Sequence, residues 1–192
     1  LLVQAGVYDA FAAKLAAAVT ALKVSHGLED NAAQGPLIDR DALAKVEDLV
    51  RDALKQGAKV LAGGKRHTLG GTFYEPTILG DVTPAMRIAS EEVFGPVAPL
   101  FKFETEAEAI ALANNTEFGL AAYFYANDMS RVWRVAEAIQ AGMVGVNTGI
   151  ISTTVAPFGG IKQSGMGREG AHQGIEDYMD TKYICMGGIH AR

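Results

Sequence analysis

The 192 residues are enough for one domain with a hydrophobic core, and 49% hydrophobic with 20% charged residues is ordinary for a globular protein. The net charge of −5 comes from 17 basic and 22 acidic residues with no basic run, which argues against nucleic acid or an anionic lipid surface as a partner. No apolar stretch approaches the length that spans a bilayer, so we expect a cytoplasmic protein without a membrane partner.

The sequence also argues against a metal site and a disulfide framework. His26, His67, His172 and His190 are widely scattered, without ligand-like spacing to each other or to Cys185. A single cysteine cannot form an intrachain disulfide and fits a reducing compartment. Cys185 lies in an apolar strand candidate with no neighbouring histidine, so we interpret it as a small buried side chain and not as a nucleophile.

The first residues indicate a chain cut from something longer. Residues 1–4, Leu-Leu-Val-Gln, lack an initiator methionine and a signal-peptide pattern, and they are typical of a strand already in progress.

Two helices and a strand are predicted in the first third of the chain. Apolar residues at helical spacing favour a helix over 9–24 that Asp9 caps. A second helix begins at Asp39 and ends at Gly57, where a left-handed residue would close it. Residues 58–62 then form a short strand candidate.

The next segments predict a hairpin, an edge strand and a short helical turn. Residues 67–71 have the composition of a hairpin or surface loop. Residues 73–79 are predicted to be extended, and Pro76 favours a position at the edge of a sheet. Thr83 followed by proline predicts one turn of helix over 85–89.

The second half alternates strands and helices. After a strand at 97–103, a capping box that begins at Thr105 opens a helix. The nearly continuous apolar run 120–125 predicts a strand covered on both faces, and the helix that Asp128 caps leads to another buried strand at 143–147. This alternation predicts an α/β fold with parallel strands and right-handed crossovers.

Two further segments follow the last of these strands. Asn147 begins a loop that runs to residue 169, and its position after a strand places it at the edge of the sheet where ligands bind. A loop of this length inside a compact domain is usually functional, and its Ile, Val and Phe content argues against disorder. Residues 177–186 predict a last strand whose free edge invites pairing with another subunit.

The most informative stretch is 90–97, Ser-Glu-Glu-Val-Phe-Gly-Pro-Val, which suits a rigid site loop better than a helix. A carboxylate two residues before an aromatic ring can accept hydrogen bonds from sugar hydroxyls while the ring covers a flat heterocycle, and Glu92 and Phe94 have this spacing. Glu91 and Glu92 point to opposite sides of an extended segment, so only one of them can face a site.

Residues 165–170 match the G-x-G-x-x-G pattern of dinucleotide-binding folds, but the context is wrong. The pattern follows a long loop instead of a strand, and no acidic residue appears about twenty positions later. We do not assign phosphate binding to it.

Three stretches in this order resemble the aldehyde dehydrogenase superfamily: Glu92-x-Phe94-Gly95-Pro96, residues 112–122 (LANNTEFGLAA) and residues 157–169 (PFGGIKQSGMGRE). The resemblance covers nearly the whole chain. It implies that Glu92 holds the ribose next to the nicotinamide of NAD or NADP, and that Phe94 packs beside the nicotinamide.

Residues 147–152, Asn-Thr-Gly-Ile-Ile-Ser, are similar to the succinate-semialdehyde dehydrogenase branch of that superfamily. In that branch the residue matching Ser152 hydrogen-bonds the distal carboxylate of the substrate, and the one matching Phe158 lines the aldehyde tunnel. A hydroxyl donor and an aromatic wall suit a short aldehyde that ends in a carboxylate. An ordinary loop serine remains an alternative for Ser152.

The resemblance also implies what the 192 residues lack. In the family the nucleophilic Cys, the general-base Glu, the oxyanion Asn and the dinucleotide-binding domain lie upstream of the segment that matches Leu1. We therefore expect a C-terminal portion with no catalytic residue of its own, no dehydrogenase activity and no retained cofactor. Residues 1–172 would be the remainder of the parallel-sheet catalytic domain. Residues 173–192 would be the strand segment through which the parent forms a homo-dimer or homo-tetramer.

Two other interpretations stay open. The substrate of the parent enzyme could be glutarate semialdehyde or an uncharged aldehyde, and NAD and NADP are not distinguished because the adenosine end is bound elsewhere. The chain could instead be a naturally short, non-catalytic binding or assembly module with the same fold.

Overall fold

The computed structural model describes residues 1–188, which form two compact units where we expected one main domain. Unit 1 runs from Leu1 to Ala109 and unit 2 begins at Ile110. The assignment of 1–172 and 173–192 to a catalytic domain and an oligomerisation segment stays a prediction. Residues 189–192, including His190, lie outside the described residues.

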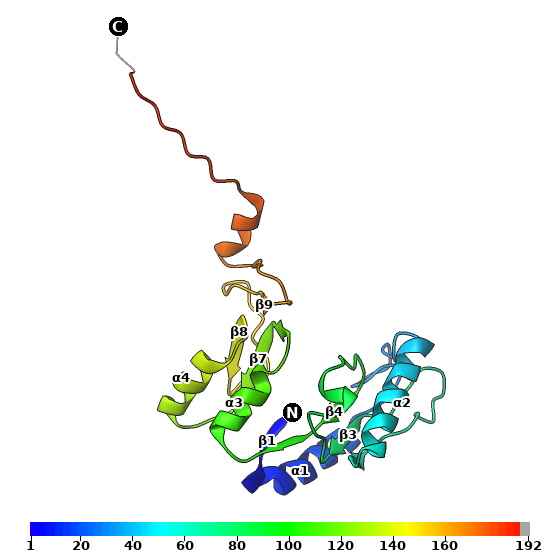
Figure 1. The fold of residues 1–192 in the computed structure, drawn as a ribbon. Coiled ribbons are helices and arrows are strands. Elements are labelled where there is room, and N and C mark those ends of the chain that lie inside the picture. The colour runs from blue at the N-terminus through cyan, green and yellow to red at the C-terminus, as the bar shows by residue number, and fades with distance from the viewer. Residues whose placement is uncertain (189–192) are drawn as a thin grey trace. The chain divides into compact units, whose positions relative to one another are not determined.

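Unit 1 is built on a mixed set of strands (Figure 1). Its strands are β1 (Leu2–Gln4), β2 (Lys59–Ala62), β3 (Thr77–Gly80), β4 (Val97–Pro99) and β5 (Phe101–Phe103). β3 is central, antiparallel to β2 and parallel to β4, and β1 pairs in parallel with β5. Leu100 joins β4 to β5 and is fully buried.

Two helices cover the two faces of β3. Successive side chains of a strand point to opposite faces. Ile78 accordingly packs in a cluster with Tyr8 and Ala12 of α1 (Tyr8–Thr20), and Leu79 packs in a cluster with Val46 of α2 (Arg40–Lys55). All four residues of β3 are buried, so unit 1 has a helix–sheet–helix core.

The predicted start and end of α2 are confirmed. The Asp39 side chain accepts a hydrogen bond from the Ala42 amide at 2.7 Å, and Gly57 follows the helix with a φ of 104°. The cap of α1 is different, because the helix begins at Tyr8 and Asp9 lies in its first turn.

The prediction of an edge strand at 73–79 is wrong. Pro76 immediately precedes β3, so its missing N–H does not interrupt the ladder of a central strand. The segment before it pairs as a hairpin as predicted, with the His67 amide donating to the Phe73 carbonyl at 3.0 Å. Two 3-10 helices complete the unit, η1 (Ala5–Val7) and η2 (Arg87–Ala89), the second in place of the helical turn expected over 85–89.

Unit 2 continues from the helix that crosses the boundary. Its elements are α3 (Glu106–Asn114), β6 (Phe118–Gly119), β7 (Ala121–Phe124), α4 (Met129–Ala138), β8 (Met143–Val146), β9 (Ile161–Lys162) and η3 (Gln173–Tyr178). β7 and β8 are parallel and α4 connects them, which confirms the predicted strand–helix–strand unit. β6 and β9 form a separate antiparallel pair.

β7 is less buried than its apolar sequence predicted. In the described part of the chain it pairs only with β8, and the Tyr123 side chain within it is 47% exposed. A two-stranded sheet against a single helix cannot cover both faces of a strand. The expectation of a strand buried on both faces is therefore wrong for this chain.

The last strand expected at 177–186 is not formed. η3 ends at Tyr178, and residues 179–188 belong to no helix or strand. A strand exists only where a second strand accepts its hydrogen bonds, and the described residues offer none to this segment.

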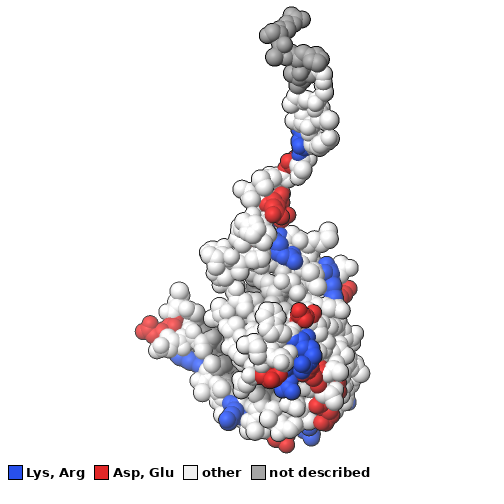
Figure 2. Space-filling view, turned by 90° about the vertical axis from the view of Figure 1, so that its left-hand side faces the viewer, with Lys and Arg blue, Asp and Glu red and all other residues white. Residues whose placement is uncertain are grey.

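No helix among residues 1–188 is long and apolar enough to cross a membrane. On the face drawn in Figure 2, basic and acidic side chains lie among one another, and neither sign forms a continuous patch.

Candidate functional site

The loop of residues 90–97, called here the site loop, is fastened to α2 by charged side chains. Arg87, at the start of η2, donates to both carboxylate oxygens of Glu91, with Nε to Oε1 at 2.7 Å and Nη2 to Oε2 at 3.1 Å. Its remaining terminal nitrogen donates to Asp48 Oδ2 of α2 at 2.7 Å. Through one guanidinium the loop is thus tied to a helix 39 positions earlier in the chain.

Backbone contacts hold the other end of the site loop. Lys45 of α2 donates its Nζ proton to the backbone carbonyl of Glu92. A Cβ on Gly95 would lie 2.4 Å from Val46 Cγ2, so only glycine allows the loop to approach the helix this closely. The Pro96 carbonyl accepts from the Thr77 amide at 2.8 Å, which joins the loop to β3.

The two predicted cofactor residues are the side chains that this fastening leaves unused. The carboxylate of Glu92 is exposed and has no hydrogen-bond or ion-pair partner among residues 1–188. Phe94 is 76% exposed and has a φ of 45°, a strained value for an aromatic residue and one that clusters at functional sites. Of the two adjacent carboxylates, Glu91 is the one that the Arg87 guanidinium binds.

This arrangement fits the nicotinamide–ribose end of a dinucleotide. A free carboxylate accepts hydrogen bonds from the two hydroxyls of a ribose, and an exposed ring offers an apolar face to a flat heterocycle. Both groups project from a loop whose backbone is held at both ends, which limits the entropy lost when a ligand binds.

The pKa shifts around the loop all favour the charged forms of Arg87, Glu91 and Asp48. The hydrogen bonds from Arg87 lower the pKa of Glu91 and of Asp48, and both carboxylates raise the pKa of Arg87. The fastening is therefore fully charged at neutral pH.

The predicted substrate residues lie in unit 2. Ser152 is exposed in the long loop after β8, whereas Phe158 is half-buried and paired with Glu169 by two backbone hydrogen bonds of 2.7 and 2.8 Å. Asn147, at the carboxyl end of β8, exchanges two side-chain hydrogen bonds with the backbone of Ala126 and so joins the ends of β7 and β8. The structure thus brings Glu92 and Phe94 together on one loop and carries Ser152 and Phe158 on another.

Arg168 is a residue of this second loop that the sequence analysis missed. Its Nη1 donates to three backbone carbonyls, those of Gly160 at 2.8 Å, Gly167 at 2.9 Å and Met166 at 3.1 Å. Its neighbour Gly159 has no room for a Cβ, which would lie 2.3 Å from the Gly167 carbonyl oxygen. The G-x-G-x-x-G match at 165–170 lies in this loop, and a 3-10 helix follows it instead of an α-helix.

Two of the family-like motifs hold each other in place. Lys162 Nζ donates to the carbonyls of Asn114 and Thr116, both at 3.1 Å, and so satisfies the end of α3. Ser164 Oγ accepts from the Gly119 amide at 3.0 Å. The charged and hydroxyl residues of the 157–169 motif therefore support structure more than they face a ligand.

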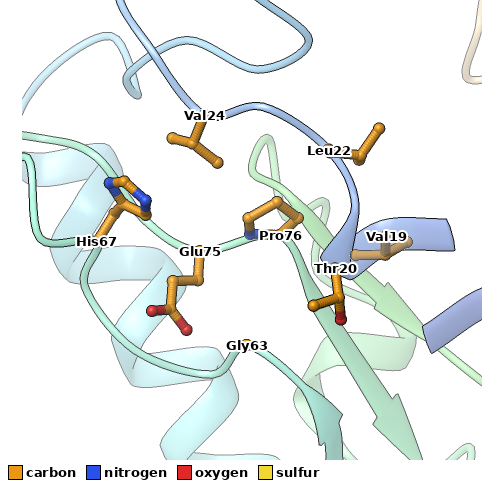
Figure 3. A pocket seen from close by; sticks show the side chains of 8 residues that line it. All are labelled: Val19, Thr20, Leu22, Val24, Gly63, His67, Glu75 and Pro76. Atoms are coloured by element: carbon orange, nitrogen blue, oxygen red, sulfur yellow. The ribbon is translucent and has the colours of Figure 1, made fainter. Parts of the chain in front are cut away.

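A small pocket of about 210 Å³ lies elsewhere in unit 1 (Figure 3). It is lined by Val19, Thr20, Leu22, Val24, Gly63, His67, Glu75 and Pro76. None of the four predicted site residues lines it. This cavity is therefore separate from the four predicted site residues.

Two observations concern metal ligands and the single cysteine. Residues 1–188 contain no cluster of three or more His, Cys, Asp or Glu side chains that could hold a metal ion. Cys185 is exposed, so its interpretation as a buried residue is wrong. The strand that was expected to bury it is not formed.

Comparison with known proteins identifies the family. The aldehyde dehydrogenase family model matches residues 1–184. A glutarate-semialdehyde dehydrogenase of Pseudomonas putida is 63% identical over 184 residues, which cover 96% of this chain and 38% of that protein. A succinate-semialdehyde dehydrogenase [NADP(+)] of Escherichia coli is 60% identical over 187 residues, which cover 97% of this chain and 39% of that protein.

Solved structures agree with the sequence comparisons. The crystal structure of succinate-semialdehyde dehydrogenase from Burkholderia pseudomallei superposes with a TM-score of 0.94 at 60% identity, over 97% of this chain and 39% of that one. The chain thus spans about two fifths of the length of the relatives it matches. On this basis the chain belongs to the aldehyde dehydrogenase family.

Proposed function

We propose that the chain is the C-terminal portion of an NAD(P)-dependent semialdehyde dehydrogenase, which in its complete form oxidises succinate semialdehyde to succinate. The observation that carries the proposal is the site loop. Glu92 and Phe94 stand free on a backbone that Arg87, Lys45 and Gly95 fix to α2. The names of the E. coli and B. pseudomallei relatives support the substrate class.

In this proposal Glu92 and Phe94 hold the nicotinamide end of the cofactor, which supplies the hydride acceptor when bound. Glu92 accepts hydrogen bonds that the ribose hydroxyls donate, and Phe94 covers one face of the base and limits its tilt. Such positioning matters because a near-attack geometry between reacting atoms accounts for much of an enzymatic rate. The choice between NAD and NADP is made at the adenosine end, to which neither residue belongs.

Ser152 and Phe158 serve the aldehyde in the same proposal. The Ser152 hydroxyl donates to the distal carboxylate, and the Phe158 ring lines the path of the short methylene chain. Phe158 suits a wall because its backbone is locked to Glu169. Glutarate semialdehyde is the second candidate substrate, favoured by the 63% identity to the P. putida relative.

The proposal also covers what the 192 residues do alone. Oxidation of an aldehyde in this family requires a thiolate, a base and the hydride acceptor together. Cys185 is the single cysteine and is exposed in a segment outside any helix or strand. The isolated chain should therefore not reduce NAD or NADP with succinate semialdehyde.

A chimera provides the test. The E. coli relative can serve as host, with its matching segment replaced by this chain, because 60% identity over 187 residues preserves most contacts. In the chimera, Ser152→Ala should raise the KM for succinate semialdehyde and leave the KM for an uncharged aldehyde of similar length unchanged. An equal effect on both aldehydes would remove Ser152 from the substrate site.

We also propose that the complete enzyme is a homo-oligomer and that residues 179–188 take part in the assembly. Apolar side chains are exposed along this segment: Met179 at 59%, Tyr183 at 86%, Ile184 at 64% and Met186 at 72%. An extended segment with free backbone groups and such side chains can add to the sheet edge of another subunit. Deletion of 179–192 in the chimera should lower the oligomeric state measured by sedimentation.

A further inference from the structure

Arg87 connects three parts of unit 1 through one side chain. Its guanidinium binds Glu91 through two parallel hydrogen bonds and Asp48 through a third, and its amide lies 3.4 Å from Asp52 Oδ2 of α2. A bidentate arginine–carboxylate pair fixes both distance and orientation, which a lysine cannot do. The geometry at Glu91 is therefore set by α2.

The orientation of Glu91 determines where the next residues point. Glu91 lies in the turn that follows η2, where its amide donates to the Arg87 carbonyl at 2.9 Å and its carboxylate is held by the Arg87 guanidinium. The backbone that leads directly to Glu92 is therefore fixed by contacts to Arg87. Phe94 then follows at a φ of 45°, a conformation that persists only where surrounding contacts impose it. Without the pair, backbone bonds to the Arg87 carbonyl and the Lys45 contact would remain, but no side chain would tie the Glu91 carboxylate to α2.

We propose that Arg87 is a positioning residue of the cofactor site, acting through Glu91 and Asp48 to hold the backbone from which Glu92 and Phe94 meet the nicotinamide end. This inference rests on the proposed function for its ligand. Its structural half, that Arg87 orders the site loop, stands on the contacts alone. Arg87 itself touches no ligand in this account, since each of its three guanidinium nitrogens donates to Glu91 or Asp48.

The structure supplies a matched control one helical turn away. Arg51 binds the other oxygen of Asp48 at 3.2 Å from within α2. In the described part of the chain it makes no bond to the site loop. Arg87→Gln and Arg51→Gln therefore remove the same charge and each break one Asp48 contact, but only Arg87→Gln releases the loop.

The first experiment is hydrogen exchange on the 192-residue chain. Arg87→Gln should raise the exchange rate of amides 91–97 by about fivefold, the size expected for a small network of exposed ion pairs. Exchange in β3 should stay unchanged. Arg51→Gln should leave 91–97 as in the original chain, and Arg87→Lys, which keeps one contact at most, should lie between. Equal exchange of 91–97 in the two glutamine variants would overturn the inference.

The second experiment measures kinetics in the chimera with NADP+. Arg87→Gln should lower kcat/KM for NADP+ about fivefold and leave the KM for succinate semialdehyde unchanged, with partial recovery in Arg87→Lys. A general loss of stability would instead lower the fraction of active enzyme. The kcat would then fall by the same factor whichever substrate is varied, with the KM values for NADP+ and succinate semialdehyde both unchanged, and that result would overturn the positioning role.

The two experiments separate this inference from the proposed function. If Glu92→Gln does not affect NADP+ kinetics while Arg87→Gln still loosens the loop, the cofactor assignment fails and the ordering role of Arg87 remains. If Glu92→Gln weakens NADP+ use and Arg87→Gln does not, the cofactor assignment remains and the positioning role is wrong.

Discussion

Gly95→Ala is the substitution whose effect the structure determines most directly. The added Cβ would lie 2.4 Å from Cγ2 of Val46, a fully buried side chain of α2 that belongs to the same hydrophobic cluster as Leu79. Carbon atoms in ordinary contact are separated by about 3.5–4.0 Å. The site loop or α2 must therefore shift by about 1 Å, or Val46 must leave its preferred rotamer.

Overpacking of this kind in a well-packed core costs about 1–3 kcal/mol. Native-state hydrogen exchange of the α2 amides measures the loss, because it reports the opening free energy of unit 1 without assuming that both units unfold together. Gly27→Ala is the control, since a Cβ there meets nothing within 4 Å and the residue does not have a positive φ.

A double mutant isolates the contact itself. Val46→Ala removes the carbon that would clash, so Gly95→Ala should cost at least 1 kcal/mol less in the Val46→Ala background than in the original chain. If Gly95→Ala destabilises α2 no more than Gly27→Ala does, or if the two substitutions are additive, the close approach of the site loop to α2 is not what requires glycine at this position.

Three further predictions concern pH and the second unit. Burial raises the pKa of Tyr74 to about 12, above the ordinary value of about 10. As pH rises, the Tyr74 hydroxyl therefore loses its proton at a lower pH in the unfolded chain than in the folded one. The free energy of unfolding should fall by on the order of 2 kcal/mol between pH 10 and 12, measured by urea denaturation followed by circular dichroism, and Tyr74→Phe should abolish this loss. The pKa of Glu91 is lowered by Arg87, so its contribution is present above the ordinary carboxyl pKa of about 4 and lost at more acid pH. The melting temperatures of the chain and Glu91→Gln should then differ at pH 7 and converge below pH 4. Lys162→Met removes the donor to the carbonyls of Asn114, the last residue of α3, and of Thr116 just after it. It should cost about 1 kcal/mol in the urea unfolding of unit 2 followed by Trp133 fluorescence, whereas an unchanged midpoint would show that water replaces the contact.

The sequence predicted well what depends on a few neighbouring residues. The caps at Asp39 and Asp128 are confirmed by bonds to amides three residues later, because a helix start is determined by its own first turn. The parallel strands β7 and β8 followed from strand and helix lengths. The family followed from motif order, which the comparisons confirm.

What the sequence could not predict depends on partners far along the chain. Nothing near Arg87 indicates that it reaches Asp48, and the central position of β3 depends on its pairing with both β2 and β4. The segment expected as a last strand has the right composition but no partner in the described residues, which composition alone cannot reveal. For the site, the spacing of Glu92 and Phe94 indicated the ligand-facing side chains, whereas the contacts that hold them are tertiary.

The most direct test of the account is the use of NADP+ by the chimera after Glu92→Gln. The substitution keeps the size of the side chain and removes the negative charge of the group that would accept hydrogen bonds from the ribose hydroxyls. Because a charge-assisted hydrogen bond contributes about 1.5–3 kcal/mol, kcat/KM for NADP+ should fall about tenfold or more, with the KM for succinate semialdehyde unchanged. Unaltered NADP+ kinetics in a folded Glu92→Gln chimera would contradict the central claim that the site loop binds the nicotinamide end of the cofactor.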